Sequence, residues 1–197
     1  MLNAHNVLIG SPDQLVTGAG LTAPIGTDLP DMTDVTKAGV TLDEAFKDFG
    51  FITEDGISLT LDRSTEVIKD WGLNAVRRYL SEFNGKLSFS FMETNKNSLE
   101  LIVGADHVDE VAASSTDGHK MMVEFGAWLP DARSWVFKIK DGSARVVIVL
   151  PNALVTSISE VTVNSTSAIT WQVDVECNAD ANGTSIYIVT DDGVVSA

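Results

Sequence analysis

Residues 86–104 read KLSFSFMETNKNSLELIVG, and they place a strand pattern directly before a helical one. Leu87, Phe89 and Phe91 alternate with polar residues, which is the period of two expected for a strand with one buried face. A strand of this kind must cover its apolar face with a second layer. The stretch therefore predicts a sheet that packs against the helix following it.

The helix is expected within residues 94–104. Its apolar residues recur at spacings of three and four, as on one face of an amphipathic helix. Thr94 or Asn95 can cap its start, and Gly104 can end it. A helix of about ten residues is only marginally stable alone, so it should depend on the sheet.

The rest of the chain is dominated by strand patterns. Residues 105–118 are expected to form an exposed loop, and residues 41–49 a helical turn. Asn84-Gly85 and Asp141-Gly142 are typical of two-residue hairpin turns. Strands are expected at residues 57–61, 75–83, 86–93, 119–129, 133–140, 144–150, 153–163, 168–177 and 184–190, with short ones near 6–9 and 15–24. Without a βαβ rhythm, this pattern predicts a mainly β fold, an antiparallel sandwich or barrel with one flanking α-helix.

The chain of 197 residues is long enough for one domain with a substantial core. We expect a single domain over residues 1–197, with an extended N-terminal arm over about residues 1–45, where Gly and Pro interrupt short apolar pieces. No apolar run approaches the roughly 20 residues that span a bilayer. The first residues lack the pattern of a secretory signal, so we expect synthesis in a cytoplasm and no membrane partner.

The charge balance is strongly acidic, with 28 acidic residues against 13 basic ones and a net charge of −15. No basic residue follows Arg145. Such a surface repels phosphate and cannot gain affinity for nucleic acid through counterion release. A protein that grips nucleic acid is therefore excluded.

Metal ligation is not expected. His5, His107 and His119 have no second histidine or cysteine at ligand spacing. Asp191-Asp192-Gly193 lacks the remaining positions of an EF-hand loop. Cys177 is the only cysteine, so no intrachain disulfide forms, and its place on an apolar strand face suits a small core residue.

Catalysis is not expected either. Asp174 and Glu176 share a strand face about 7 Å apart, and a glycosidase could use such a pair. Nothing near them in the sequence would separate their pKa values, however. We therefore expect no enzyme and no cofactor, and a protein that works through its surfaces.

Three segments resemble a known family in their order and spacing: TGAGLTAPIGTDLP at 17–30, FKDFGFITEDGISL at 46–59, and residues 86–104. They resemble the major tail protein of bacteriophages with long non-contractile tails, with most likeness to phages infecting actinobacteria. The resemblance implies a β-sandwich with a flanking helix, here without the immunoglobulin-like C-terminal domain of some relatives.

The resemblance also implies an assembly. Six subunits would form a ring, the inner sheets would join into one barrel, and the rings would stack into a tube that carries DNA during ejection. The implied partners are further copies of the chain and the tail tip, tape-measure and tail terminator proteins. The implied location is the virion tail, after assembly in the host cytoplasm.

A negatively charged lumen would let DNA slide where a basic one would hold it. Alternation in residues 168–177 places polar side chains opposite Ile169, Trp171 and Val173. The expected lumen-facing residues are Ser157, Ser159, Thr170, Gln172, Asp174 and Glu176.

The interval DRSTEVIKDWGLN, residues 62–74, is long for a hairpin, which needs two to five residues to join its strands. We expect it to be a loop that reaches the adjacent ring. Its contacts would come from Asp62, Arg63, Glu66, Val67, Ile68, Lys69, Asp70 and Trp71. The alternative is a surface loop whose Trp71 folds back onto its own core.

Other classes share a β-sandwich, among them capsid decoration proteins, injection-system tube subunits and carbohydrate-binding modules. A carbohydrate-binding module would present a row of exposed aromatic residues. Trp128, Trp135 and Trp171 are expected in the core instead, which leaves Trp71 alone.

Overall fold

The computed structural model describes residues 7–13, 19–31 and 41–194. The helices are α1 (Lys96–Val103) and the short 3₁₀ helix η2 (Ala105–His107). The strands are β1 (Ser11–Pro12), β2 (Gly20–Pro24), β3 (Lys47–Asp48), β4 (Ile52–Lys69), β5 (Ala75–Phe91), β6 (Val108–Val111), β7 (Lys120–Val123), β8 (Arg133–Asp141), β9 (Ala144–Ile158), β10 (Trp171–Asn178) and β11 (Tyr187–Asp191). All strand pairs are antiparallel, which confirms the mainly β prediction.

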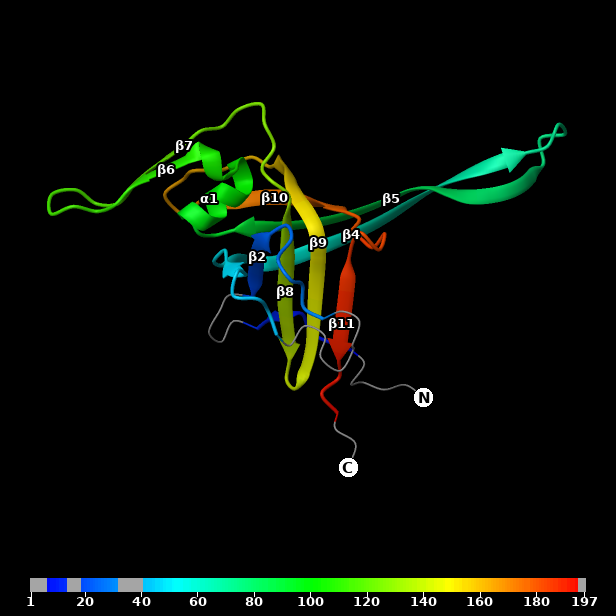
Figure 1. Ribbon diagram of the computed structural model, residues 1–197, viewed down its shortest axis with the longest axis horizontal. Coiled ribbons are helices and arrows are strands. Elements are labelled where there is room, and N and C mark those ends of the chain that lie inside the picture. The colour runs from blue at the N-terminus through cyan, green and yellow to red at the C-terminus, as the bar shows by residue number, and fades with distance from the viewer. Residues whose placement is uncertain (1–6, 14–18, 32–40, 195–197) are drawn as a thin grey trace.

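The main sheet runs in the order β3-β2-β8-β9-β10-β5-β4, with β1 beside β8 and β11 beside β9. Strand β9 belongs to two layers of this sheet. Its first half pairs with β8 and β11, and its second half pairs with β10. Opposite Asp174 and Val175 the register shifts, which leaves Thr156 as the extra residue of a β-bulge. In Figure 1 the layer of β2, β8, β9 and β11 consequently crosses the layer of β4, β5 and β10.

Phe49 lies at the centre of the core between the two layers. Its ring lies within 5.2–6.0 Å of the rings of Phe89, Phe91, Trp135 and Phe137, all of them buried. Geometries of this kind stabilise aromatic pairs beyond simple burial. The burial of Phe89 and Phe91 confirms the strand face predicted from their alternation.

Helix α1 covers the outer side of this core. The Asn95 side chain accepts a hydrogen bond from the Ser98 backbone N–H at 2.9 Å, and the Ser98 hydroxyl accepts one from the Asn95 N–H at 3.2 Å. This reciprocal cap selects Asn95 over Thr94 as the start of the helix. Gly104 ends the helix at a φ of 97°, as expected. Leu99 is among the buried residues of α1.

The hairpin turn predicted at Asn84-Gly85 is wrong. Both residues lie inside β5, where Gly85 pairs with Leu61 on one side and Cys177 on the other. A Cβ at Gly85 would meet Ile186 Cδ1 at 2.7 Å. Glycine therefore leaves room for the Ile186 side chain here and does not form a turn.

Several smaller predictions also change. Residues 41–49 hold only a turn and β3, and the expected loop at 105–118 contains η2 and β6. The two strands expected at 144–163 are the single strand β9, whereas the Asp141-Gly142 turn is confirmed. Residues 124–129 are not strand, and Trp128 is 39% exposed rather than in the core. Asn6 and residues 15–18 of the expected early strands, with His5, lie outside the described residues.

Candidate assembly surfaces

The interval expected as a loop is itself β-structure. We call residues Asp62–Asn84 the arm; Asp62 pairs with Asn84 at its base, and pairing continues to Lys69 and Ala75. The arm leaves the body of the molecule as a long two-stranded ribbon (Figure 1). All of its side chains are exposed except that of Val67, which is half-buried. Among the described residues of its own subunit, the arm therefore has almost nothing to pack against.

Contacts between its two strands hold the arm together. The Tyr79 hydroxyl donates a hydrogen bond to the Glu66 carboxylate at 2.5 Å, and this bond raises the pKa of Tyr79. The Arg63 guanidinium lies 5.9 Å from the centre of the Phe83 ring. Directly opposite pairs of this kind stabilise antiparallel strands, so the arm is built as an ordered element.

The tip of the arm is a tight turn at residues 70–74. The Asp70 carboxylate accepts hydrogen bonds from the Asn74 side chain and from its backbone N–H, the latter at 2.8 Å, and these bonds lower the pKa of Asp70. Leu73 adopts a φ of 65°, a conformation uncommon for residues other than glycine.

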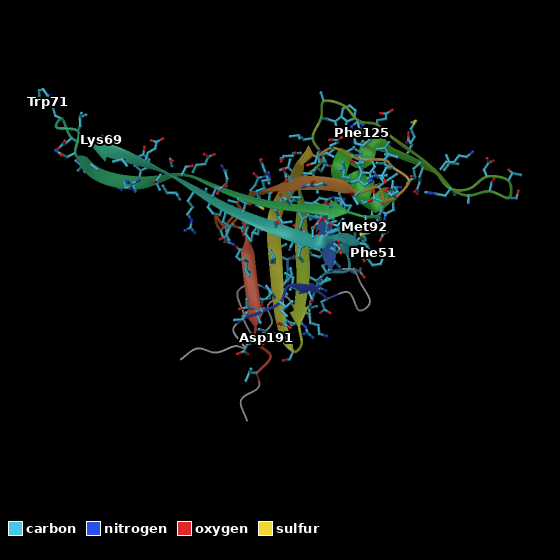
Figure 2. The ribbon with its side chains drawn as sticks, turned by 180° about the vertical axis from the view of Figure 1, so that it is seen from behind. Phe51, Lys69, Trp71, Met92, Phe125 and Asp191 are labelled. Atoms are coloured by element: carbon cyan, nitrogen blue, oxygen red, sulfur yellow. The ribbon has the colours of Figure 1, made fainter. Side chains whose placement is uncertain are left out.

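Trp71 is fully exposed at this tip, at 102% of its reference area, and Figure 2 shows it at the far end of the arm. It does not fold back onto its own core, so that alternative is wrong. A large exposed aromatic side chain on an ordered turn is the kind of group that anchors protein interfaces.

The arm differs in charge from the rest of the chain. The arm holds four basic side chains, Arg63, Lys69, Arg77 and Arg78, and four acidic ones, Asp62, Glu66, Asp70 and Glu82. The chain as a whole has a net charge of −15. An arm without net charge is therefore attached to a strongly acidic body.

A polar face lies on the outer side of β4, β5, β10 and β9, opposite the core. Asp174 of β10 pairs with Ser88 of β5 and Ser157 of β9. Its neighbours Val173 and Val175 point the other way and are fully buried. The alternation predicted for residues 172–176 is thus correct, although nothing here identifies the face as a lumen.

The other expected lumen residues lie partly on the strands and partly beyond their ends. Gln172 and Glu176 are exposed on β10. Thr170 precedes β10, and Ser159 follows β9, where the Ser159 backbone N–H donates to the Gln172 carbonyl at 2.9 Å. The six residues therefore gather in one part of the molecule but do not form one continuous strand face.

Asp174 has partners that the sequence did not indicate. Lys86 Nζ lies 2.7 Å from its carboxylate, and the Ser88 hydroxyl donates to it at 2.6 Å. Partial burial raises the pKa of Asp174, but the hydrogen bonds from Lys86 and Ser88 outweigh burial and hold the pKa below its usual value. The polar face is consequently less negative than its carboxylates alone suggest.

Two strand edges border this polar face. Strand β4 pairs only with β5 among the described residues, so its outer edge is open. On the other side, residues 154–158 of β9 pair with β10 and with no second described strand. Open edges of this kind invite pairing with another chain.

Groups that could perform chemistry are not assembled in the part of the chain that the structure describes. No cluster of three metal-ligating side chains occurs there, and none of the described helices is long and apolar enough to cross a bilayer. His107 stacks on Trp128 at 3.9 Å, and His119 faces Glu110 at 3.3 Å. Burial raises the pKa of the Cys177 thiol to about 12, which keeps it protonated.

Two solved structures share features of this fold. One is the cap that terminates the tube of the anti-feeding prophage, with 13% identity over 94% of each chain and a TM-score of 0.44. The other is the extended sheath–tube complex of an extracellular contractile injection system, with 8% identity, 95% of this chain and 98% of that chain covered, and a TM-score of 0.44. No curated protein sequence matches the chain.

Residues 2–197 match the family model described as phage tail tube protein. The match spans nearly the whole chain. Proteins of this family are structural components of the virion tail and not enzymes, in agreement with the expectation from the sequence. The chain belongs to the phage tail tube protein family.

Proposed function

We propose that this tail tube subunit forms hexameric rings that stack into the tube of a long non-contractile tail, the conduit for DNA ejection. The ring follows from the two open edges that border the polar face. If β4 of one subunit pairs with residues 154–158 of the next, the sheets continue from subunit to subunit. A closed ring of this kind leaves no edge unpaired along its barrel.

The polar face would line the barrel. Gln172, Asp174, Glu176 and Ser157 point away from the core, and no basic residue other than Lys86 lies on the paired parts of β5, β9 and β10 near them. Ser159 and Thr170 would stand at the rim. A face that is polar and mildly negative does not bind the phosphate backbone, which suits passage without retention.

The arm would connect one ring to the next, and its exposure is the observation on which this part of the proposal rests. A ribbon of exposed strands, ending in a fully exposed tryptophan, packs against no other part of the subunit within residues 7–13, 19–31 and 41–194. The expected contact residues Asp62, Arg63, Glu66, Val67, Ile68, Lys69, Asp70 and Trp71 all lie on it. Because the arm carries no net charge, it can approach the acidic body of a second copy without the repulsion that two acidic surfaces would meet.

The experiment is the substitution Trp71→Ala, compared with Val163→Ala, which truncates another exposed apolar side chain on the body. We expect Trp71→Ala to leave the melting temperature unchanged, because no core contact is lost. Tube formation, followed by negative-stain electron microscopy over a range of concentrations, should fall at least tenfold, which corresponds to about 1.4 kcal/mol per contact. Val163→Ala should assemble normally.

Tubes from Trp71→Ala in wild-type yield would contradict the role of the arm in stacking. A lowered melting temperature with normal assembly would show instead that Trp71 stabilises its own subunit.

The proposal also includes the domain organisation and the biological setting. The chain would be a single domain with an N-terminal arm, assembled in the host cytoplasm of a phage of actinobacteria. Its partners would be the tail tip, tape-measure and terminator proteins.

A further inference from the structure

An apolar groove of about 550 Å³ opens where β4 begins. Its walls include Phe51, Ile57, Met92, Phe137 and Ile139. Phe51 is 59% exposed and Met92 is 42% exposed, and Figure 2 shows the two side by side on the body. Solvent-exposed apolar side chains that line a pocket of this size are typical of binding sites.

The groove is shaped by an interruption of the strand pairing. Ile52 pairs with Phe91 and Ile57 with Phe89, so residues 53–56 bulge out of the ladder. The Glu93 carboxylate holds the base of this bulge by accepting a hydrogen bond from the Phe51 backbone N–H at 3.0 Å. This hydrogen bond holds the base of the bulge in place within the subunit itself.

The rim of the groove is mostly acidic. Glu54 and Asp55 are exposed on the bulge and line the opening, and Lys138 stands on the opposite wall. The chemistry that fits is a large apolar side chain flanked by cations. Glu54 and Asp55 would meet the cations, while the apolar walls would take the side chain.

The arm tip has this composition. Trp71 is its apolar group, and Lys69, Arg77 and Arg78 lie on the strands next to the turn. The one carboxylate of the turn, Asp70, is bonded to Asn74 within the tip. The groove lies at the first residues of β4 and the tip follows its last residue. A strand of 18 residues spans roughly 60 Å, so no copy can fill its own groove.

We propose that the groove receives the Trp71 tip of the neighbouring copy along the tube, with Glu54 and Asp55 facing Arg77 and Arg78. This inference deepens the proposed stacking of rings and rests on it. Because the two halves of the contact lie at opposite ends of one strand, the contact is head-to-tail. A head-to-tail contact repeats without limit and so produces a filament.

Disulfide trapping tests the pairing directly. Cys177 is the only cysteine, and burial keeps its thiol protonated, so it should form few unintended disulfides. The variant Gly72→Cys with Met92→Cys places one thiol beside Trp71 and the other in the groove. Under mild oxidation, assembled tubes should yield a ladder of covalent oligomers on a non-reducing gel, and unassembled subunits should not.

The matched control pairs Gly72→Cys with Val163→Cys, at an exposed position outside the groove. Tubes that give no Gly72–Met92 ladder, or an equal ladder with Val163→Cys, would overturn the groove as the receptor and leave stacking by the arm intact. Failure of the wild-type protein to form tubes at any concentration would instead refute the proposed function, and the inference with it.

Charge reversal gives a second test that does not depend on cysteine geometry. Glu54→Lys with Asp55→Lys, and separately Arg77→Glu with Arg78→Glu, should each lower the yield of tubes roughly tenfold. Combining all four changes restores opposite charges across the contact and should recover most of the yield. If the combined variant folds but assembles no better than either parent, the pairing is wrong.

Discussion

The pairing of Lys86 with Asp174 shows what single residues contribute. The alternation of residues 172–176 predicted which side chains face away from the core, since a strand with one buried face fixes this. It could not predict that β5 lies beside β10. Ser88 and Asp174 are 86 positions apart in the sequence, and only the folded sheet brings them together. A carboxylate expected to add negative charge is therefore largely neutralised.

This pairing predicts a pH-dependent contribution to stability. The folded-state pKa of Asp174 is lowered, so its ionised form stabilises the fold above the unfolded-state pKa of about 3.9, and this stabilisation is lost as pH falls through the lower, folded value. We expect Asp174→Asn to cost about 1 kcal/mol at pH 7. The cost should be smaller at pH 3 than at pH 7, and it should vanish once the pH is low enough to protonate Asp174 in the folded state.

Urea denaturation of both proteins at the two pH values measures this difference. Glu176→Gln removes a neighbouring exposed carboxylate for which no salt bridge is seen, and serves as the control. An equal cost of Asp174→Asn at pH 7 and pH 3 would mean that the loss does not come from the ionised pair.

At the scale of elements, prediction worked where an element has one buried face. The apolar spacing and the cap of α1 located the helix, and the alternation of Leu87, Phe89 and Phe91 located the body half of β5. The arm has no buried face, so its first strand lacks alternation, and the sequence predicts a loop over residues 62–74 and a strand only over residues 75–83. Asn84-Gly85 has the composition of a hairpin turn, but the turn lies at residues 70–74.

Gly85 provides a test of this correction. A new Cβ at this position would stand 2.7 Å from Ile186 Cδ1 and 3.4 Å from Cys177 Cβ, so the Ile186 side chain must move from its packed position. We expect Gly85→Ala to destabilise the subunit by about 1–3 kcal/mol. At Gly118 a Cβ would meet no atom within 4 Å, so Gly118→Ala should be neutral within about 0.5 kcal/mol.

Denaturant midpoints of the two variants check the comparison. If Gly85→Ala proved as stable as Gly118→Ala, the close approach at Gly85 would not constrain the sheet, and a turn-forming role would have to be considered again.

At the scale of the whole molecule, the sequence indicated the fold class and the acidic charge but not the assembly surfaces themselves. Open edges at β4 and β9 depend on strand order, and the groove depends on an interrupted register between Ile52 and Ile57. Neither follows from local patterns. The length of the interval 62–74 and the resemblance to tail tube proteins predict a contact element there, but its form as a paired ribbon is visible only in the structure.

The lumen assignment predicts an effect that only the assembled tube can show. Glu176→Lys should leave ring and tube formation intact, because the side chain is exposed. It should lower DNA delivery at least tenfold by adding a ring of cations to the conduit. Asp174→Lys is unsuitable for this purpose, since it would place a second ammonium group against Lys86 and destabilise the subunit.

Infective titre and electron microscopy of particles carrying Glu176→Lys measure the two effects separately. Asp109→Lys makes the same change of charge on β6, away from the polar face, and should have no effect. Full infectivity of the Glu176→Lys particles would show that this face does not line the conduit.

If the arm tip of one copy occupies the groove of the next, the tube has a direction, because Trp71 at the tip and Phe51 and Met92 at the groove lie at opposite ends of the molecule (Figure 2). In such a tube, every interior copy has both its arm tip and its groove in contact with a neighbour. Only the arm tips of the ring at one end and the grooves of the ring at the other end then remain without a partner. A protein that starts the tube and a protein that stops it thus meet different chemistry. Each needs to imitate only half of the contact, and subunits can be added at one end while the other is already sealed.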